Sequence, residues 1–110
     1  MTLRELNHYF NEILRPQDFS DDPSMNGIQV QNSDMDKPIN KVAFAVDACL
    51  ESILRAKEAK ADVLVVHHGM FWGQSFTLVD SAYQKIKTLM DSDMALYAAH
   101  LPIDANKEVG

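Results

Sequence analysis

The sequence predicts an α/β fold with a parallel or mostly parallel sheet, built from βαβ units and flanked by helices. Three apolar runs, at residues 42–46, 63–66 and 94–99, have the length and composition of buried strands. Segments with apolar residues at helical spacing lie between these runs, so strand and helix alternate. This alternation is typical of right-handed crossovers in a parallel sheet. A chain of 110 residues is one domain at most, and we expect a single α/β domain over residues 1–110.

The N-terminal segment is expected to form an amphipathic helix. Thr2 and Glu5 match the capping box, in which each side chain satisfies an exposed backbone amide. Apolar residues then recur at helical spacing as far as Leu14, and Pro16 ends the helix.

Two loops and a short strand are expected next. Residues 17–24 and 31–40 have the composition of loops. Between them, a turn at Asn26 and Gly27 precedes the alternating residues 28–30, which predict a short strand.

The remaining elements follow the alternation of strand and helix. The run at residues 42–46 is almost continuously apolar, which predicts a strand covered on both faces. Asp47 is a candidate N-cap of the helix that follows it, and Asp80 or Ser81 is a candidate N-cap of the next helix. Residues 69–79 are expected to form an aromatic loop bounded by glycines.

Composition and charge exclude several classes of function. The net charge of −6, without a basic run, argues against nonspecific binding to nucleic acid. No segment approaches the roughly 20 apolar residues of a membrane span, and the first residues do not resemble a signal peptide. The single cysteine, Cys49, excludes an internal disulfide. We therefore expect a cytoplasmic protein that neither binds nucleic acid strongly nor enters a membrane.

Polar side chains capable of binding a metal follow two of the expected strands. His67 and His68 come directly after residues 63–66, and His100 and Asp104 follow residues 94–99. Ligands bind at the carboxyl ends of strands in open α/β sheets, and imidazole with carboxylate is a donor set for divalent metals. The pattern predicts that these groups gather along one edge of the sheet.

The adjacent histidines leave three possibilities open. Successive residues of a regular strand point to opposite faces, so His67 and His68 would not reach one ion from a regular strand. The chain could leave strand geometry there, which Gly69 permits, or each histidine could serve a different ion of a two-metal centre. The third possibility is a histidine pair at the end of a strand that only caps backbone groups.

The other candidates also have structural alternatives. Asp104 could ligate a metal, or it could cap a short helix that starts at Ala105. His100 could contact a metal-binding side chain and orient it without binding the metal itself. Asp47, if not a helix cap, could accept a hydrogen bond from a ligating imidazole. Phe71 and Trp72 could form one pocket wall that stacks on a planar base, or they could pack as ordinary core.

Four sequence blocks, in this order, resemble one known family. The chain is similar to the NGG-interacting-factor-like proteins, which are commonly named GTP cyclohydrolase I type 2 homologues. The most specific blocks are His-His-Gly-x-Phe-Trp-Gly and Ala-Ala-His-Leu-Pro-x-Asp. The four blocks lie at residues 26–30, 46–48, 67–73 and 96–105.

The resemblance implies an α/β fold that is half of a larger two-lobed fold. It also implies a pair of divalent metal ions per complete subunit, of unknown identity among Zn, Mn, Fe and Mg, and assembly into a toroidal hexamer. By motif, His67 and His68 would ligate one metal each, Asp104 would be the carboxylate ligand, and His100 would have a supporting place. The family often has histidine where this chain has Asn106.

The chain also departs from the family in length. Family members continue well past Gly110 and supply further ligands from a His-x-x-x-Glu segment, so this chain resembles their N-terminal portion. We expect the 110-residue chain by itself to be inactive.

The leading functional hypothesis is a metal-dependent hydrolase that acts on nucleotide-like small molecules. The alternative is a metal-binding scaffold or regulatory protein without catalysis. A third possibility is a structural fragment in which the ligands are present but no site is assembled.

Overall fold

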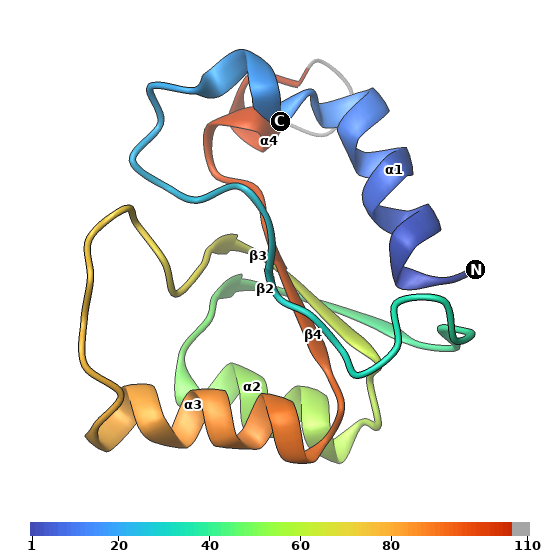
Figure 1. The fold of residues 1–110 in the computed structure, drawn as a ribbon, viewed down its shortest axis with the longest axis vertical. Helices are drawn as coiled ribbons and strands as arrows, with labels where there is room; N and C mark the ends of the chain where they lie inside the picture. The colour runs from blue at the N-terminus through green and yellow to red at the C-terminus, as the bar shows by residue number, and fades with distance from the viewer. Residues whose placement is uncertain (107–110) are drawn as a thin grey trace.

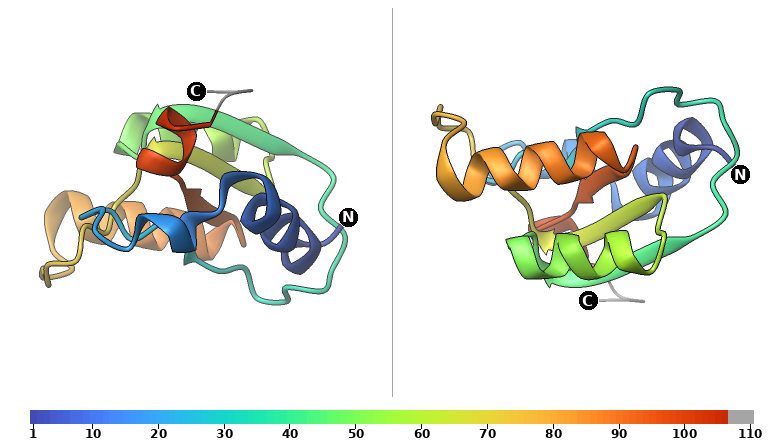
Figure 2. Two further views of the ribbon diagram at one scale, coloured as in Figure 1. Left: turned by 90° about the horizontal axis from the view of Figure 1, so that it is seen from above. Right: turned by 90° about the horizontal axis from the view of Figure 1, so that it is seen from below.

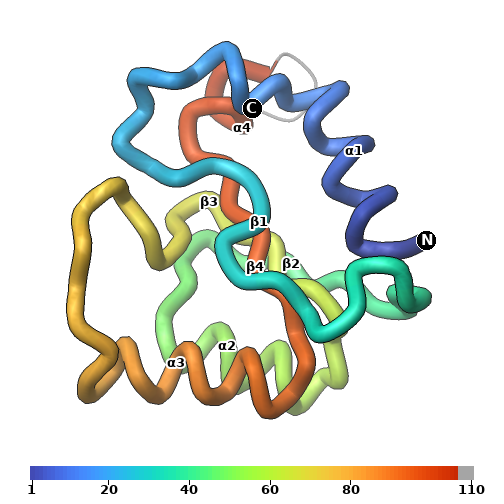
Figure 3. Tube along the Cα trace, viewed as in Figure 1, coloured from blue at the N-terminus to red at the C-terminus, as the bar shows by residue number. Residues whose placement is uncertain are grey.

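A four-stranded mixed sheet forms the centre of the molecule, in the order β1-β4-β3-β2 (Figures 1 and 3). The computed structural model describes residues 1–106. The strands are β1 (Gly27–Val30), β2 (Val42–Asp47), β3 (Val63–His68) and β4 (Ala95–Ala98). The helices are α1 (Leu3–Leu14), the 3-10 helix η1 (Pro16–Phe19), α2 (Leu50–Glu58), α3 (Asp80–Asp91) and α4 (Leu101–Asp104).

The parallel part of the sheet is built as the sequence predicts. β2 pairs with β3 and β3 with β4, both in parallel, and a helix connects each strand to the next. The short β1 is antiparallel to β4, so the sheet is mixed. Helices α2 and α3 lie together on one face, and α1 lies on the other (Figures 1 and 2). Because β2, β3 and β4 run in the same direction, their carboxyl ends meet at one edge of the sheet.

Strands β3 and β4 are buried on both faces. Along β3, Leu64 and Val66 pack into the cluster beneath α2 and α3, whereas Val63 and Val65 pack into the cluster beneath α1. Successive side chains of a strand point to opposite faces, so a continuous apolar run fills both clusters. Each fully buried side chain of this size contributes about 1.5–3 kcal/mol through the hydrophobic effect.

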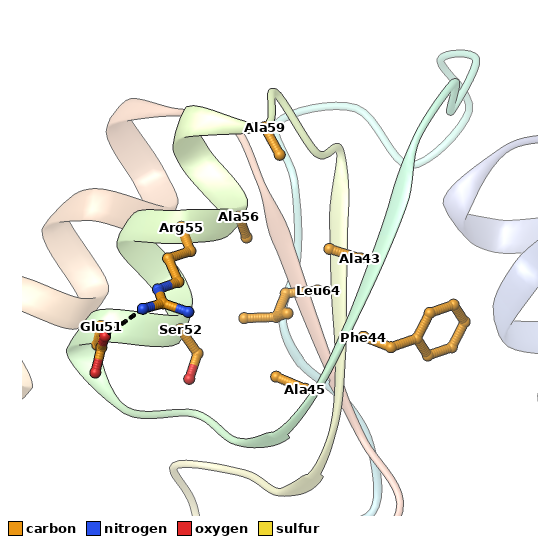
Figure 4. Close-up of a pocket in the computed structure, with 9 residues that line it drawn as sticks. All are labelled: Ala43, Phe44, Ala45, Glu51, Ser52, Arg55, Ala56, Ala59 and Leu64. Atoms are coloured by element: carbon orange, nitrogen blue, oxygen red, sulfur yellow. Dashed lines mark ion pairs between the residues drawn. The ribbon is translucent and has the colours of Figure 1, made fainter.

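Strand β2 is an edge strand, and only one of its faces is covered. Ala43 and Ala45 pack toward α2, whereas Phe44 points to the opposite face (Figure 4). Phe44 is 73% exposed, and Val46, two residues along the same strand, is 64% exposed. The prediction that residues 42–46 are covered on both faces is therefore wrong. The apolar composition of the run is right, but the described residues supply nothing to cover the Phe44 face.

Helix α1 confirms the capping prediction. The Thr2 hydroxyl accepts a hydrogen bond from the Glu5 amide, and the Glu5 carboxylate accepts one from the Thr2 amide. The helix ends at Leu14, because Arg15 adopts a left-handed conformation with φ of 50° and Pro16 follows. Pro16 then begins η1, so part of the expected loop at residues 17–24 is helical.

Two other cap predictions are wrong. Asp47 is the last residue of β2, and the N-cap of α2 is Cys49, without a side-chain hydrogen bond. Similarly, the N-cap of α3 is Val79, and Asp80 lies inside the first turn. Both helices form because their apolar faces pack on the sheet, and neither needs a polar cap to start.

Within residues 1–106, no helix is long and apolar enough to cross a membrane.

Candidate metal centre

Polar side chains gather where the parallel strands end. β2 ends at Asp47, which pairs in register with His68 at the end of β3. β4 ends at Ala98, two residues before His100, which is the N-cap of α4. The predicted gathering at one edge of the sheet is therefore observed, whereas metal binding there stays a prediction.

Three imidazoles form the centre of this group. One ring nitrogen from each of His67, His68 and His100 lies within 4.8 Å of the others. The ring centroids of His67 and His68 are 4.5 Å apart, and those of His67 and His100 are 4.8 Å apart. At the end of β3 the alternation of side chains thus no longer separates the two adjacent histidines. All three are half-buried, which leaves them accessible from solvent.

A separate carboxylate contacts each histidine of β3. His67 Nε2 lies 3.0 Å from Asp104 Oδ1, and His68 Nδ1 lies 2.6 Å from Asp47 Oδ1. Asp104 is the last residue of α4, so the alternative in which it caps a helix starting at Ala105 is wrong. Asp47 takes the alternative role: instead of capping a helix, it forms a hydrogen bond with His68, a candidate metal ligand.

A third carboxylate, which sequence reasoning missed, contacts His100. Asp22 Oδ1 lies 3.1 Å from His100 Nδ1, and the Asp22 side chain is fully buried. Burial by itself raises the pKa of Asp22, but hydrogen bonds from Asn26, Leu101, Ser24 and His100 outweigh it and lower the pKa to about 2. Asp22 is thus a buried, ionised carboxylate. The sequence shows only a loop rich in aspartate at this point, because the donors to Asp22 come partly from the other end of the chain.

The two aromatic residues after the histidine pair have different environments. The Trp72 ring lies 5.1 Å from that of His100 and 6.0 Å from that of His68, and its Nε1 donates to the Gly69 carbonyl. Phe71 instead packs against the core cluster beneath α2 and α3. Of the two alternatives for this pair, core packing therefore applies to Phe71, and Trp72 alone lies beside the imidazoles.

The donor set fits a divalent cation. Neutral imidazole nitrogens and carboxylate oxygens are ligands of zinc, manganese and iron. Asp47 holds Nδ1 of His68, which leaves Nε2 of that ring as the nitrogen available to a metal. His67 Nε2 and Asp104 Oδ1 already lie close enough together to contact one ion. The groove of about 380 Å³ between α2 and β2 has no histidine in its lining: small residues make up most of it, with the Glu51–Arg55 ion pair at its rim (Figure 4).

Comparison with known families agrees with these motifs. Residues 1–110 match the model of the family described as Duf34/NIF3 (NGG1p interacting factor 3). The chain belongs to this family. The family predicted from the sequence blocks is thereby confirmed, including the match to an N-terminal part of the relatives.

Curated members of the Duf34/NIF3 family are longer than this chain. A GTP cyclohydrolase 1 type 2 homolog of Treponema pallidum is 49% identical, and the match covers 100% of this chain and 38% of the relative. A protein of the same name from Archaeoglobus fulgidus is 44% identical, with 100% of this chain and 43% of the relative covered. The chain thus spans about two fifths of the length of these relatives.

Solved structures share this fold. TTHA1606 from Thermus thermophilus has a TM-score of 0.94 at 44% identity, over 100% of this chain and 44% of that chain. Reduced HcgD from Methanocaldococcus jannaschii has a TM-score of 0.86 at 30% identity, over 97% of this chain and 42% of that chain. The predicted α/β fold is confirmed, and it forms less than half of these longer chains.

Proposed function

We propose that this chain carries part of the active site of a divalent-metal-dependent hydrolase that acts on nucleotide-like small molecules. The observation that supports this proposal is the convergence of three imidazoles with the Asp104 carboxylate at one edge of the sheet. Relatives named GTP cyclohydrolase 1 type 2 homolog suggest nucleotide chemistry. The proposed metal is Zn, Mn, Fe or Mg, and imidazole donors favour Zn and Fe.

The proposed ligands are His67, His68 and Asp104. His67 and His68 contact different carboxylates, Asp104 and Asp47, which supports two ions per complete subunit rather than one. A bound divalent ion would supply Lewis acidity at a substrate oxygen. Asp47 would fix the ring of His68 by accepting from Nδ1, and in this way would keep the orientation of its Nε2 constant.

Trp72 supports a planar substrate. Its indole ring lies beside the rings of His68 and His100 and is only partly buried. An aromatic face next to imidazole and carboxylate donors can stack on a nucleobase and bring the reacting atom to the donors.

A non-catalytic metal-binding scaffold or regulatory protein is the second candidate. The observation that favours it is that Asp22, Asp47 and Asp104 each bond to a histidine. Among the described residues at this edge, no carboxylate is therefore left over to serve as a general base.

Metal binding is tested first. The 110-residue chain is loaded with Zn²⁺, Mn²⁺, Fe²⁺ or Mg²⁺, dialysed, and measured by elemental analysis and thermal unfolding. We expect bound metal and a raised Tm, because a ligand that binds only the native state stabilises it. His68→Ala should abolish both effects, whereas the matched control His8→Ala, an exposed histidine of α1, should retain them. Equal binding by both variants would reject the site.

Hydrolysis is tested second, with nucleoside triphosphates as substrates and the metal-loaded chain as catalyst. Product formation above the level of His68→Ala supports the hydrolase. Stoichiometric metal without turnover in a full-length family member favours the scaffold, and no metal effect on the Tm of the 110-residue chain favours a structural fragment. The same assay on a full-length family member determines whether missing activity belongs to the family or only to this chain.

The proposal includes assembly and location. We propose self-association, with the toroidal hexamer as the complete assembly, and the exposed apolar face of β2 supports it. The exposed, unpaired thiol of Cys49 is compatible with the reducing cytoplasm as the proposed location.

A further inference from the structure

Asp22 is surrounded by three N–H donors and one ring nitrogen, so that each oxygen has two contacts. Oδ1 accepts from the Ser24 amide at 3.1 Å and lies 3.1 Å from His100 Nδ1. Oδ2 accepts from Asn26 Nδ2 at 3.0 Å and from the Leu101 amide at 2.9 Å. A carboxylate satisfies this arrangement because both of its oxygens accept. An amide in the same place would direct its own N–H groups at two donors.

The same loop also holds the backbone of His100. Asn26 Oδ1 accepts from the His100 amide at 2.7 Å. Together with the bonds to Asp22, three hydrogen bonds fix the ring and backbone of His100 and the backbone of Leu101. This junction joins β4 to α4, and α4 ends at Asp104, so the loop also determines where Asp104 lies.

The contact determines which nitrogen of His100 carries the proton. The three N–H donors around Asp22 stabilise its carboxylate form, which can only accept, so Nδ1 of His100 is the donor and the neutral ring keeps its lone pair on Nε2. A ring nitrogen of His100 lies within 4.8 Å of nitrogens of both His67 and His68.

We propose that Asp22 is a positioning residue that holds His100 as the Nδ1-protonated tautomer and thereby makes its Nε2 a third nitrogen donor at this centre. Asp22 does not itself act as a ligand, because both oxygens are occupied and the side chain is fully buried. The role as a metal donor rests on the proposed function, whereas the tautomer does not.

The tautomer is tested on the metal-free chain. Long-range ¹H–¹⁵N correlation spectra at mildly alkaline pH distinguish a protonated Nδ1 from a protonated Nε2. We expect His100 to show protonated Nδ1 in the wild type and in Asp21→Asn, a control with the same charge change at an exposed neighbour. In Asp22→Asn, the Nδ1-protonated form of His100 should no longer be the main tautomer. Protonated Nε2 in the wild type, or an unchanged spectrum in Asp22→Asn, would overturn the proposal.

The donor role is tested by cobalt titration, followed by visible absorption and calorimetry. We expect Asp22→Asn to weaken Co²⁺ binding about 10- to 100-fold, as loss of an orienting carboxylate does at other metal sites, and Asp21→Asn to leave it unchanged. Equal affinity in Asp22→Asn and the wild type would reject the positioning role while leaving the metal site intact. No Co²⁺ binding by the wild type would reject the metal site and with it the donor role, while the tautomer result would still stand.

A second variant covers the case in which Asp22→Asn does not fold. In His100→Asn, the side-chain Nδ2 can still donate to Asp22, but no nitrogen remains where Nε2 stood. We expect this variant to fold, as judged by circular dichroism, and to bind Co²⁺ more weakly with an altered absorption band. Wild-type affinity and absorption in His100→Asn would show that His100 is not a donor.

Discussion

Gly69 shows how closely three chain segments approach one another at the candidate centre. A Cβ atom at this position would lie 2.3 Å from Gln29 Oε1 and 2.7 Å from the Cβ of Ala98. The sequence suggests a glycine chosen for unusual backbone angles, but among the described glycines the positive φ values belong to Gly27 and Gly73. Glycine is required at position 69 because neighbouring atoms occupy the space of a side chain.

Replacing Gly69 with alanine should therefore destabilise the fold. Gln29 cannot simply move away, since its Oε1 accepts from the amides of Met70 and Phe71 and holds the loop on β1. We expect Gly69→Ala to lower the free energy of unfolding by about 1–3 kcal/mol in urea denaturation, the usual cost of overpacking. Ser75→Ala, in an exposed part of the same loop, should change it little. Equal stability of the two variants would contradict the close approach.

The lowered pKa of Asp93 predicts that the fold loses stability in acid. Hydrogen bonds from the Lys37 ammonium, the Ser33 amide and the Ser33 hydroxyl lower the pKa of Asp93 to about 2. Because the folded pKa lies below the unfolded value of 3.8, the stabilisation is complete above pH 3.8 and is lost as the pH falls toward 2. Since a third of the side chain is exposed, we expect about 1 kcal/mol rather than the full conversion.

The measurement compares the wild type with Asp93→Asn in urea unfolding across this pH range. Asparagine tolerates the left-handed conformation of Asp93, whose φ is 50°. The difference in stability should be present at neutral pH and shrink below pH 3.8. Asp91→Asn is the control, because its ion pair with Lys87 is exposed and contributes little. A difference that does not vary with pH would contradict the assignment.

Among the elements, α1 depends on its first residues. Thr2 supplies the capping hydrogen bond, and no basic residue lies in the last turn to stabilise the other end. Because α1 covers the face of the sheet that contains Tyr97, fraying of its first turn would loosen the packing of the fully buried Leu3.

Thr2→Ala should lower the free energy of unfolding by about 1 kcal/mol, the typical effect of losing an N-cap. Thermal and urea unfolding measure the change, with Thr77→Ala in an exposed loop as the matched control. Hydrogen exchange should become faster at the amides of the first turn. An unchanged exchange rate at Glu5 would show that the cap does not hold the helix start.

Elements with long periodic patterns could be predicted from the sequence, and exact helix starts could not. The apolar runs of β3 and β4 and the spacing in α1 depend on local pattern alone. Whether Asp47 ends a strand or caps a helix depends instead on how far β2 pairs with β3, which is a tertiary property. The sequence pattern therefore predicts a helix cap at Asp47, whereas in the structure Asp47 is the last residue of β2.

The candidate site could be predicted from the sequence only in part. His67, His68 and Asp104 come together because parallel strands end at one edge, a rule of topology that the pattern already contains. The contact between Asp22 and His100 joins residues 78 positions apart, through a loop without periodicity. No local signal distinguishes a buried aspartate in such a loop from the exposed Asp21 beside it.

At the scale of the whole molecule, the two faces of the sheet are covered unequally at β2. Phe44 and Val46 are exposed on an edge strand whose outer backbone groups have no neighbouring strand among the described residues. An apolar unpaired edge is a template for another strand. In relatives more than twice as long as this chain, additional polypeptide is available to cover such an edge.

For the 110-residue chain in solution, a second copy can occupy the same edge. If two β2 strands pair in antiparallel fashion with Phe44 opposite Phe44, Lys41 of one copy lies opposite Asp47 of the other, and Val42 lies opposite Val46. At both ends of the strand pair, opposite charges then face each other and apolar side chains face each other. We expect the average mass in sedimentation equilibrium to rise with concentration toward that of a dimer.

Phe44→Lys should weaken this association by at least about tenfold, because two ammonium groups would face each other at the centre of the pair. Tyr9→Lys is the control, since it places the same charge on an exposed aromatic position of α1. If both variants associate as the wild type does, the β2 edge is not the interface. If the wild type remains a monomer at all concentrations, the apolar edge alone does not suffice, and covering it requires the additional polypeptide of the longer relatives.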